Sequence, residues 1–132
     1  MKNDLQQIAV AARLRAYAPY SRFAVGAALL SKSGTIVSGC NVENVSFGLT
    51  ICAERVCVVK AVDQGENDFA ALAIVADTEI PIVPCGACRQ VLAEFSPNLL
   101  ITSWTLTGQS QEFSLGDLLP LPKQGILVPR GT

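Results

Sequence analysis

Two short stretches decide how this chain folds around a site and what that site can do: Cys52-Ala53-Glu54-Arg55 and Pro84-Cys85-Gly86-Ala87-Cys88-Arg89-Gln90. The cysteines at positions 52, 85 and 88 are enough to hold a zinc ion and leave its fourth position open. Three protein ligands plus a water is the arrangement of catalytic zinc sites, whereas structural sites usually fill all four positions with protein. Glu54 lies two residues after the first cysteine, where its carboxylate can exchange protons with that water. The two stretches therefore predict a catalytic zinc site.

Both stretches fall at predicted helix starts, which favours metal binding by their thiols. Cys85 and Cys88 are three residues apart, so their side chains can converge on one ion. At the start of another helix, unpaired N–H groups and the helix dipole favour the thiolate of Cys52. Three thiolates around Zn²⁺ leave a net charge of about −1. We therefore expect Arg55, and secondarily Arg89, to donate hydrogen bonds to ligand sulfurs.

Composition limits the classes of function. The chain has 132 residues, half of them hydrophobic, which suits one domain over 1–132 with a sizeable core. The formal charge of −1 and the lack of a Lys/Arg cluster argue against binding to polymeric nucleic acid. No apolar run approaches the roughly 20 residues of a membrane span, and no signal-peptide core follows Met1. The expected location is cytoplasmic, without a membrane partner.

The cysteine and histidine counts narrow the chemistry further. Five cysteines, an odd number without an export signal, favour metal or redox chemistry over a disulfide framework. Histidine is absent, which removes Ser-His-Asp and Cys-His catalysis together with imidazole ligands. Acid–base work near neutral pH must therefore fall to a carboxylate, a cysteine, a lysine or a metal-bound water.

The remaining sequence predicts an α/β order. A first helix, capped by Asn3, is expected to end near Tyr17-Ala18 because Pro19 cannot continue it. Strands are predicted at 25–31, 35–39, 69–76, 99–106 and 111–115, and further helices over 52–65 and 88–95. Polar or proline-bounded loops are predicted at 41–46 and 80–84, and a surface segment begins at Leu118. This order predicts an α/β fold, a three-layer α/β/α sandwich with a mixed five-stranded sheet.

Two other interpretations of the cysteines remain open. A structural zinc site would take a fourth sulfur from Cys40 or Cys57. Cys57 lies five residues after Cys52, roughly 140° around a helix, and should point elsewhere, whereas spacing does not exclude Cys40. A thiol-redox protein would cycle Cys85 and Cys88, which have Cys-x-x-Cys spacing at a helix start.

The combined motifs resemble those of the small homotetrameric zinc-dependent cytidine deaminases, over almost the whole chain. Three ligands, a non-ligand Glu and Pro-Cys-x-x-Cys are the pattern of zinc deaminases. The further matching stretches are Tyr20-Ser21-Arg22-Phe23-Ala24-Val25-Gly26-Ala27-Ala28 and Asn41-Val42-Glu43-Asn44. Cysteine at position 52 separates the chain from related deaminases that typically have histidine there. Blasticidin S-type aminonucleoside deaminase, also with three cysteines, is the alternative.

The resemblance implies a pyrimidine-salvage enzyme that hydrolyses cytidine and 2'-deoxycytidine to uridine and 2'-deoxyuridine plus ammonia. One Zn²⁺ per subunit, held by Cys52, Cys85 and Cys88, would activate a water for attack on C4 of the base. Glu54 would shuttle protons. The implied substrate-binding residues are Phe23 against the base, Asn41 and Glu43 at the ribose hydroxyls, Val42 between them, and Ala53, whose N–H meets O2.

Simpler roles exist for some of these residues. Phe23 can be a core residue, and Asn41 and Glu43 can cap a turn. Glu43 adds an independent argument, because a carboxylate at the sugar accepts hydroxyls and repels a phosphate. It therefore favours a nucleoside over a nucleotide.

The C-terminal region departs from the family pattern. Small cytidine deaminases usually have an aromatic residue shortly after Leu-Leu-Pro, reaching over the base in a neighbouring subunit. Here Leu118-Leu119-Pro120 is followed by Leu121 and Pro122, and no aromatic occurs after Phe113. The sequence therefore suggests a roomier pocket that also accepts N4-substituted cytidines. The apolar composition and the resemblance together predict a homotetramer.

Overall fold

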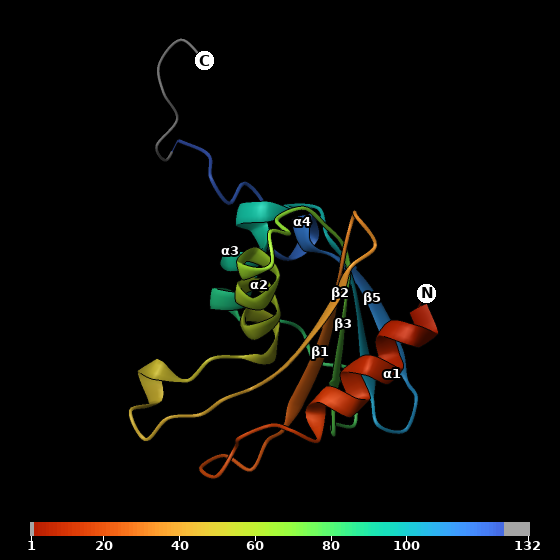
Figure 1. Ribbon diagram of the computed structural model, residues 1–132, viewed down its shortest axis with the longest axis vertical. Coiled ribbons are helices and arrows are strands. Elements are labelled where there is room, and N and C mark those ends of the chain that lie inside the picture. Colours follow the sequence, from red (N-terminus) through yellow and green to blue (C-terminus); the bar gives the residue numbers. More distant parts are fainter. Residues whose placement is uncertain (1, 126–132) are drawn as a thin grey trace.

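The computed structural model describes residues 2–125 and shows one five-stranded sheet with helices on both faces (Figure 1). The elements follow one another as α1 (Lys2–Arg13), β1 (Val25–Ser31), β2 (Ile36–Cys40), the 3-10 helix η1 (Phe47–Leu49), α2 (Ala53–Asp63), β3 (Phe69–Ala76), α3 (Gly86–Phe95), β4 (Leu100–Thr105), β5 (Ser110–Ser114) and α4 (Leu115–Leu118). No helix among the described residues is long and apolar enough to cross a membrane.

The sheet is mixed, with the strand order β2-β1-β3-β4-β5. β1 pairs antiparallel with both β2 and β3, β4 runs parallel to β3, and β5 returns antiparallel along β4. The parallel pair needs a crossover connection, which α3 supplies. The predicted three-layer sandwich around a mixed five-stranded sheet is confirmed.

The central strands are buried on both faces, which explains their nearly continuous apolar sequence. Along β3, Leu72 and Ile74 belong to the larger core under α2 and α3, whereas Ala73 and Val75 belong to a smaller core under α1. On the sheet face covered by α1, small buried residues such as Ala28 and Ala73 let the helix pack closely. A Cβ on Gly26 would lie 2.0 Å from the carbonyl oxygen of Ala9, so only glycine fits there.

Both ends of the first helix differ from the prediction. The first helix ends at Arg13, not near Ala18, because Tyr17 pairs with the segment after β2. The backbone N–H of Tyr17 donates to Asn41 O (3.0 Å), and Glu43 N–H donates to Tyr17 O (2.9 Å). The helix also begins before Asn3, which is a helical residue and not the cap.

The other differences are small. β2 begins and ends one residue later than predicted, and β4 is one residue shorter at each end. β5 begins and ends one residue earlier than predicted, so that Leu115 begins α4 instead of ending a strand. Tertiary pairing decides such ends, and local patterns rarely resolve them.

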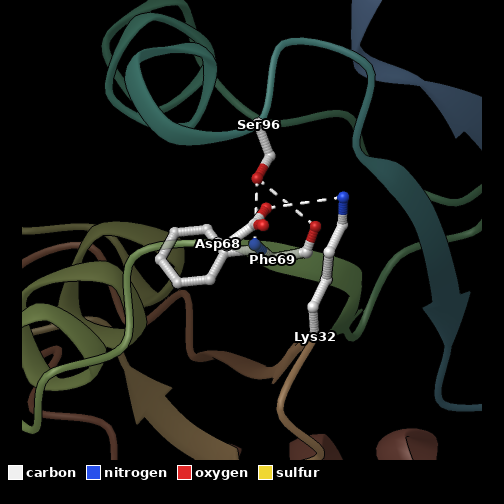
Figure 2. Close-up of polar contacts among 4 residues, drawn as sticks. All are labelled: Lys32, Asp68, Phe69 and Ser96. Atoms are coloured by element: carbon white, nitrogen blue, oxygen red, sulfur yellow. Dashed lines mark hydrogen bonds and ion pairs between the residues drawn. The ribbon is translucent and has the colours of Figure 1, made fainter.

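Polar contacts connect β3 to the end of α3 at the end of the sheet where β3 begins (Figure 2). The hydroxyl of Ser96, just after α3, accepts a hydrogen bond from Phe69 N–H (3.0 Å) and lies 3.3 Å from Phe69 O. Lys32 forms an exposed ion pair with Asp68 beside it, at 3.5 Å. The buried Ser96 contacts join the start of β3 to the end of α3 and so set the position of that helix on the sheet.

At the opposite end of the sheet, several segments far apart in sequence meet. The chain between α1 and β1, the long loop after β2, and the starts of α2 and α3 all lie there (Figure 1). This end carries the candidate site.

Candidate functional site

The three predicted zinc ligands converge where two helices begin. Cys52 is the N-cap residue of α2, Cys85 is the N-cap residue of α3, and Cys88 follows within the first turn of α3. The sulfurs of Cys52 and Cys85 are 3.7 Å apart, and all three sulfurs lie within 4.8 Å of one another. The helices thus bring together cysteines that are more than thirty residues apart in the sequence.

This cluster fits a zinc ion. A tetrahedral ion with Zn–S bonds of about 2.3 Å spaces its sulfurs by about 3.8 Å, close to the separation of Cys52 and Cys85. Among the described residues, which include all five cysteines, the group that could hold a metal contains these three and no fourth ligand. Cys57 is buried in the core instead, and Cys40 ends β2 outside the cluster. A structural four-sulfur site therefore finds no fourth sulfur here.

The side chain of Arg55 contacts the cluster, whereas the side chain of Arg89 does not. Nη2 of Arg55 lies 3.5 Å from the sulfur of Cys52 and 3.5 Å from Thr50 O. The pKa of Cys52 is lowered to about 5, first by a hydrogen bond from the Cys88 thiol and then by Arg55, which together outweigh burial. Arg89 donates to Pro84 O (2.7 Å) and Leu118 O (3.2 Å), so it fixes the chain around Cys85 and not a sulfur.

Glu54 is a buried carboxyl group beside the cysteines. Its side chain is on the first turn of α2, and the residue is only 4% exposed. Burial raises its pKa to about 7, because the charged form is poorly solvated there. A carboxyl group with this pKa can both accept and release a proton near neutral pH, as a general acid–base group must.

A cavity of about 360 Å³ is lined by Glu54 and by two of the three cysteines, Cys52 and Cys85. Its lining residues come from the 21–25 segment, the loop after β2, the start of α2 and the loop before α3: Ser21, Phe23, Val25, Asn41, Glu43, Thr50, Cys52, Ala53, Glu54, Ile82, Val83 and Cys85. The volume suits a small organic ligand.

Most of the predicted substrate-binding residues line this cavity. Phe23 is 40% exposed, which excludes the simpler role of a core side chain. Asn41 is buried and also has the simpler role, since its side chain bonds the backbone of the 23–25 segment. Val42 is not among the lining residues, and its backbone pairs with Ile51. Ala53 lines the cavity together with its sequence neighbours Cys52 and Glu54.

The Glu43 side chain is held by hydrogen bonds from the segment between α1 and β1. Its carboxylate accepts hydrogen bonds from Tyr20 N–H (3.0 Å), Ser21 N–H (3.1 Å) and the Ser21 hydroxyl. The Ser21 hydroxyl is the main cause of the lowered pKa of Glu43. The carboxylate therefore stays ionised across the neutral range.

Sequence reasoning missed several lining residues. Ile82 and Val83 lie in the loop that was predicted between two prolines, but nothing local in the sequence indicates that this loop turns back over the cysteines. Thr50 and Ser21 are single polar residues in irregular segments. Ser21 lies in the 20–28 stretch that resembles the family, but its residue type alone does not indicate a role there.

The sequence profile described as "Cytidine and deoxycytidylate deaminase zinc-binding region" matches residues 1–103. The chain belongs to this family. It is 52% identical over 113 residues to a cytidine deaminase of Halalkalibacterium halodurans, covering 85% of this chain and 86% of that protein. The crystal structure of cytidine deaminase from Burkholderia pseudomallei superposes with a TM-score of 0.88 at 48% identity, covering 91% of this chain and 97% of that one.

A relative of the alternative type is more distant. Blasticidin-S deaminase of Bacillus cereus is 30% identical over 105 residues, covering 74% of each chain. The higher identity to cytidine deaminases, over more of the chain, favours that branch of the family.

Proposed function

We propose that this protein is a zinc-dependent hydrolase that converts cytidine and 2'-deoxycytidine to uridine and 2'-deoxyuridine plus ammonia. The observation that carries the proposal is the position of Glu54, a buried carboxyl group that lines the same cavity as Cys52 and Cys85 of the sulfur cluster. Family membership and about 50% identity to cytidine deaminases support it.

Cys52, Cys85 and Cys88 would hold the ion. Bound zinc lowers the pKa of a coordinated water and supplies the nucleophile at neutral pH. Glu54 takes a proton from the attacking water at its carboxylate and delivers it to N3 of the base, which removes amidine resonance and makes C4 electrophilic. The carboxylate then takes the second proton, from the hydroxyl now on C4, and gives it to the amino group, so that the C4–N4 bond breaks, ammonia leaves and the C4 carbonyl of uridine forms. A pKa of about 7, caused by burial, suits both directions of transfer.

The cavity wall supports the proposed substrate contacts. Phe23 presents an exposed ring where the base can pack, and Ala53 offers a backbone N–H for O2. Asn41 and Glu43 supply polar atoms for the sugar hydroxyls. Val42 contributes through its backbone, whose pairing with Tyr17 and Ile51 holds the neighbouring residues Asn41 and Glu43 in place.

The ionised Glu43 also supports a nucleoside as the substrate. Its lowered pKa keeps a negative charge at the sugar end of the cavity, where a 5'-phosphate would be repelled. Binding of a polymeric nucleic acid is disfavoured by the same charge and by the near-zero net charge of the chain.

We further propose a homotetramer in the cytoplasm. Large apolar side chains are exposed on the outer face of α2 and on the loop beside the cavity, including Val59 (57%), Phe47 (74%) and Leu49 (66%). Such surface is typical of subunit contacts. All five cysteines lie outside disulfides, and thiols available to bind zinc suit a reducing compartment.

One assay tests the activity. Cytidine should lose its characteristic ultraviolet absorbance as uridine forms, and a chelator should stop the change until zinc is restored. Blasticidin S, offered in parallel, should react far more slowly. Zinc-loaded protein that leaves cytidine unchanged would contradict the proposal, and thiol-disulfide cycling of Cys85 and Cys88 would then be the function to examine.

A further inference from the structure

Five of the cavity-lining residues are joined by one continuous chain of hydrogen bonds. Ser21, Phe23, Val25, Asn41 and Glu43 all line the cavity, and each bonds to the next group along its wall. Asn41 Nδ2 donates to Phe23 O (2.7 Å), and Asn41 Oδ1 accepts from Val25 N–H (2.9 Å). The chain thus connects the two residues proposed for the sugar with the segment that presents Phe23.

The hydroxyl of Ser21 takes part in two hydrogen bonds of this chain, and in only one of them can it be the donor. Phe23 N–H can act only as a donor, so the Ser21 oxygen accepts at that contact (3.0 Å). The Ser21 proton is therefore donated to Oε2 of Glu43, the other neighbour of the hydroxyl. One side chain joins the base-facing segment to the carboxylate.

Glu43 depends on these donors for its orientation. It is half-buried and belongs to neither hydrophobic core, so packing alone does not hold its carboxylate. Oε1 accepts two backbone N–H groups and Oε2 accepts the Ser21 hydroxyl. A carboxylate has about four lone-pair positions. One position, on the oxygen that Ser21 holds, is left to accept a hydroxyl group of a ligand.

We propose that Ser21 is a positioning residue of this enzyme, whose hydroxyl orients Glu43 so that Oε2 accepts the 2'- or 3'-hydroxyl of the bound nucleoside. The inference rests on the proposed function and adds a residue that acts through Glu43, without contact to the reacting atoms. Loss of the Ser21 hydroxyl should weaken substrate binding and leave the proton transfers of Glu54 intact.

The test compares Ser21→Ala with wild type on cytidine and on 2',3'-dideoxycytidine, which lacks the 2'- and 3'-hydroxyls of the sugar. We expect KM for cytidine to rise roughly tenfold, the usual effect of losing a hydrogen bond to a charged group, while kcat changes little. On the dideoxy substrate the two proteins should have similar KM values. Ser21→Thr keeps a hydroxyl and should restore most of the affinity.

Matched controls separate this role from a general effect on the loop. Ser46→Ala removes a hydroxyl from the neighbouring loop, outside the cavity lining, and should leave both substrates unaffected. In a Glu43→Gln background, adding Ser21→Ala should cost much less than it does alone, because the two residues act as one unit. Calorimetric binding of uridine gives the same comparison without turnover.

The outcomes distinguish the inference from the function on which it rests. An active wild type with equal losses by Ser21→Ala on both substrates, or with no loss on either, would overturn the role of Ser21 alone. A kcat loss without a KM change would also overturn it. Wild-type protein that neither binds uridine nor converts cytidine would overturn both.

Discussion

Gly39 of β2 lies against Cys57 of α2 so closely that no side chain fits between them. A Cβ on Gly39 would be 3.0 Å from the Cys57 sulfur and 2.8 Å from the carbonyl oxygen of Ala53. This contact sets the distance between the strand and the first turns of the helix. Because Cys52 caps that helix, the glycine also determines where one zinc ligand lies relative to the other two.

Replacing Gly39 by alanine should therefore displace the start of α2. Overpacking of this kind typically destabilises by about 1–3 kcal/mol, and we expect a lower melting temperature and weaker zinc retention. Gly48→Ala is the matched control, since nothing lies within 4 Å of a Cβ there. A Gly39→Ala protein with wild-type stability and zinc content would show that α2 can move without disturbing the site.

Glu54→Gln should separate folding from catalysis. The amide has nearly the same shape and cannot exchange protons, so the variant should fold and bind zinc normally. Turnover of cytidine should fall by at least ~10²–10⁴-fold, because one group serves several proton transfers. Zinc content by atomic absorption and an initial-rate assay check both parts. Near-normal turnover would remove Glu54 from the mechanism.

The sulfur cluster can be tested by comparing cysteines inside and outside it. Cys85→Ser should lower the zinc content well below one per subunit and abolish activity, because a hydroxyl is a poor substitute for a thiolate ligand. Cys40→Ser changes a half-buried cysteine outside the cluster and should retain zinc and turnover. Loss of zinc in both variants would instead support a four-sulfur site.

Elements with strong local signals were predicted well from the sequence. β3 occupies Phe69–Ala76 as expected, because eight almost uniformly apolar residues suit a strand buried on both faces. The end of α1 was wrong because it depends on the pairing of Tyr17 with Val42, twenty-five residues away. Pro19 sets only the last position at which the helix could end. The pairing of Tyr17 makes α1 end earlier, at Arg13.

The site follows the same division between local and long-range information. Cys52, Glu54 and the Cys-x-x-Cys pair were predicted because their chemistry and spacing are encoded in short stretches. Ser21 and Ile82 could not be placed, since their approach to the cavity depends on how two irregular segments fold across the sheet end. The hydrogen bond from Ser21 to Glu43 joins residues twenty-two positions apart and has no local signature.

The segment after α4 lies along α3, as the predicted surface segment should. Gln90 donates to Pro122 O (3.3 Å), and Lys123 donates to Glu94 O (2.9 Å). No residue of 118–125 lines the cavity of its own chain. In place of the missing aromatic, the sequence offers Leu121 and Ile126 as apolar residues to cover the base, and Ile126 lies outside the described residues. In the proposed homotetramer, residues 118–125 could therefore cover only the cavity of a neighbouring subunit.

The missing C-terminal aromatic leads to a prediction about leaving groups. An aromatic contact with the base contributes ~0.5–1.5 kcal/mol, so its absence should weaken cytidine binding by up to roughly tenfold. It should also leave room beside the amino group, so that N4-methylcytidine and N4-acetylcytidine are accepted and release methylamine or acetamide. The proton transfers by Glu54 would be unchanged, since only the leaving group must fit. The measurement is kcat/KM for cytidine and both analogues, alongside a relative that has the aromatic. Equal discrimination by the two enzymes would contradict the prediction and indicate that Leu121, which is 72% exposed in one chain, covers the base of a neighbour instead.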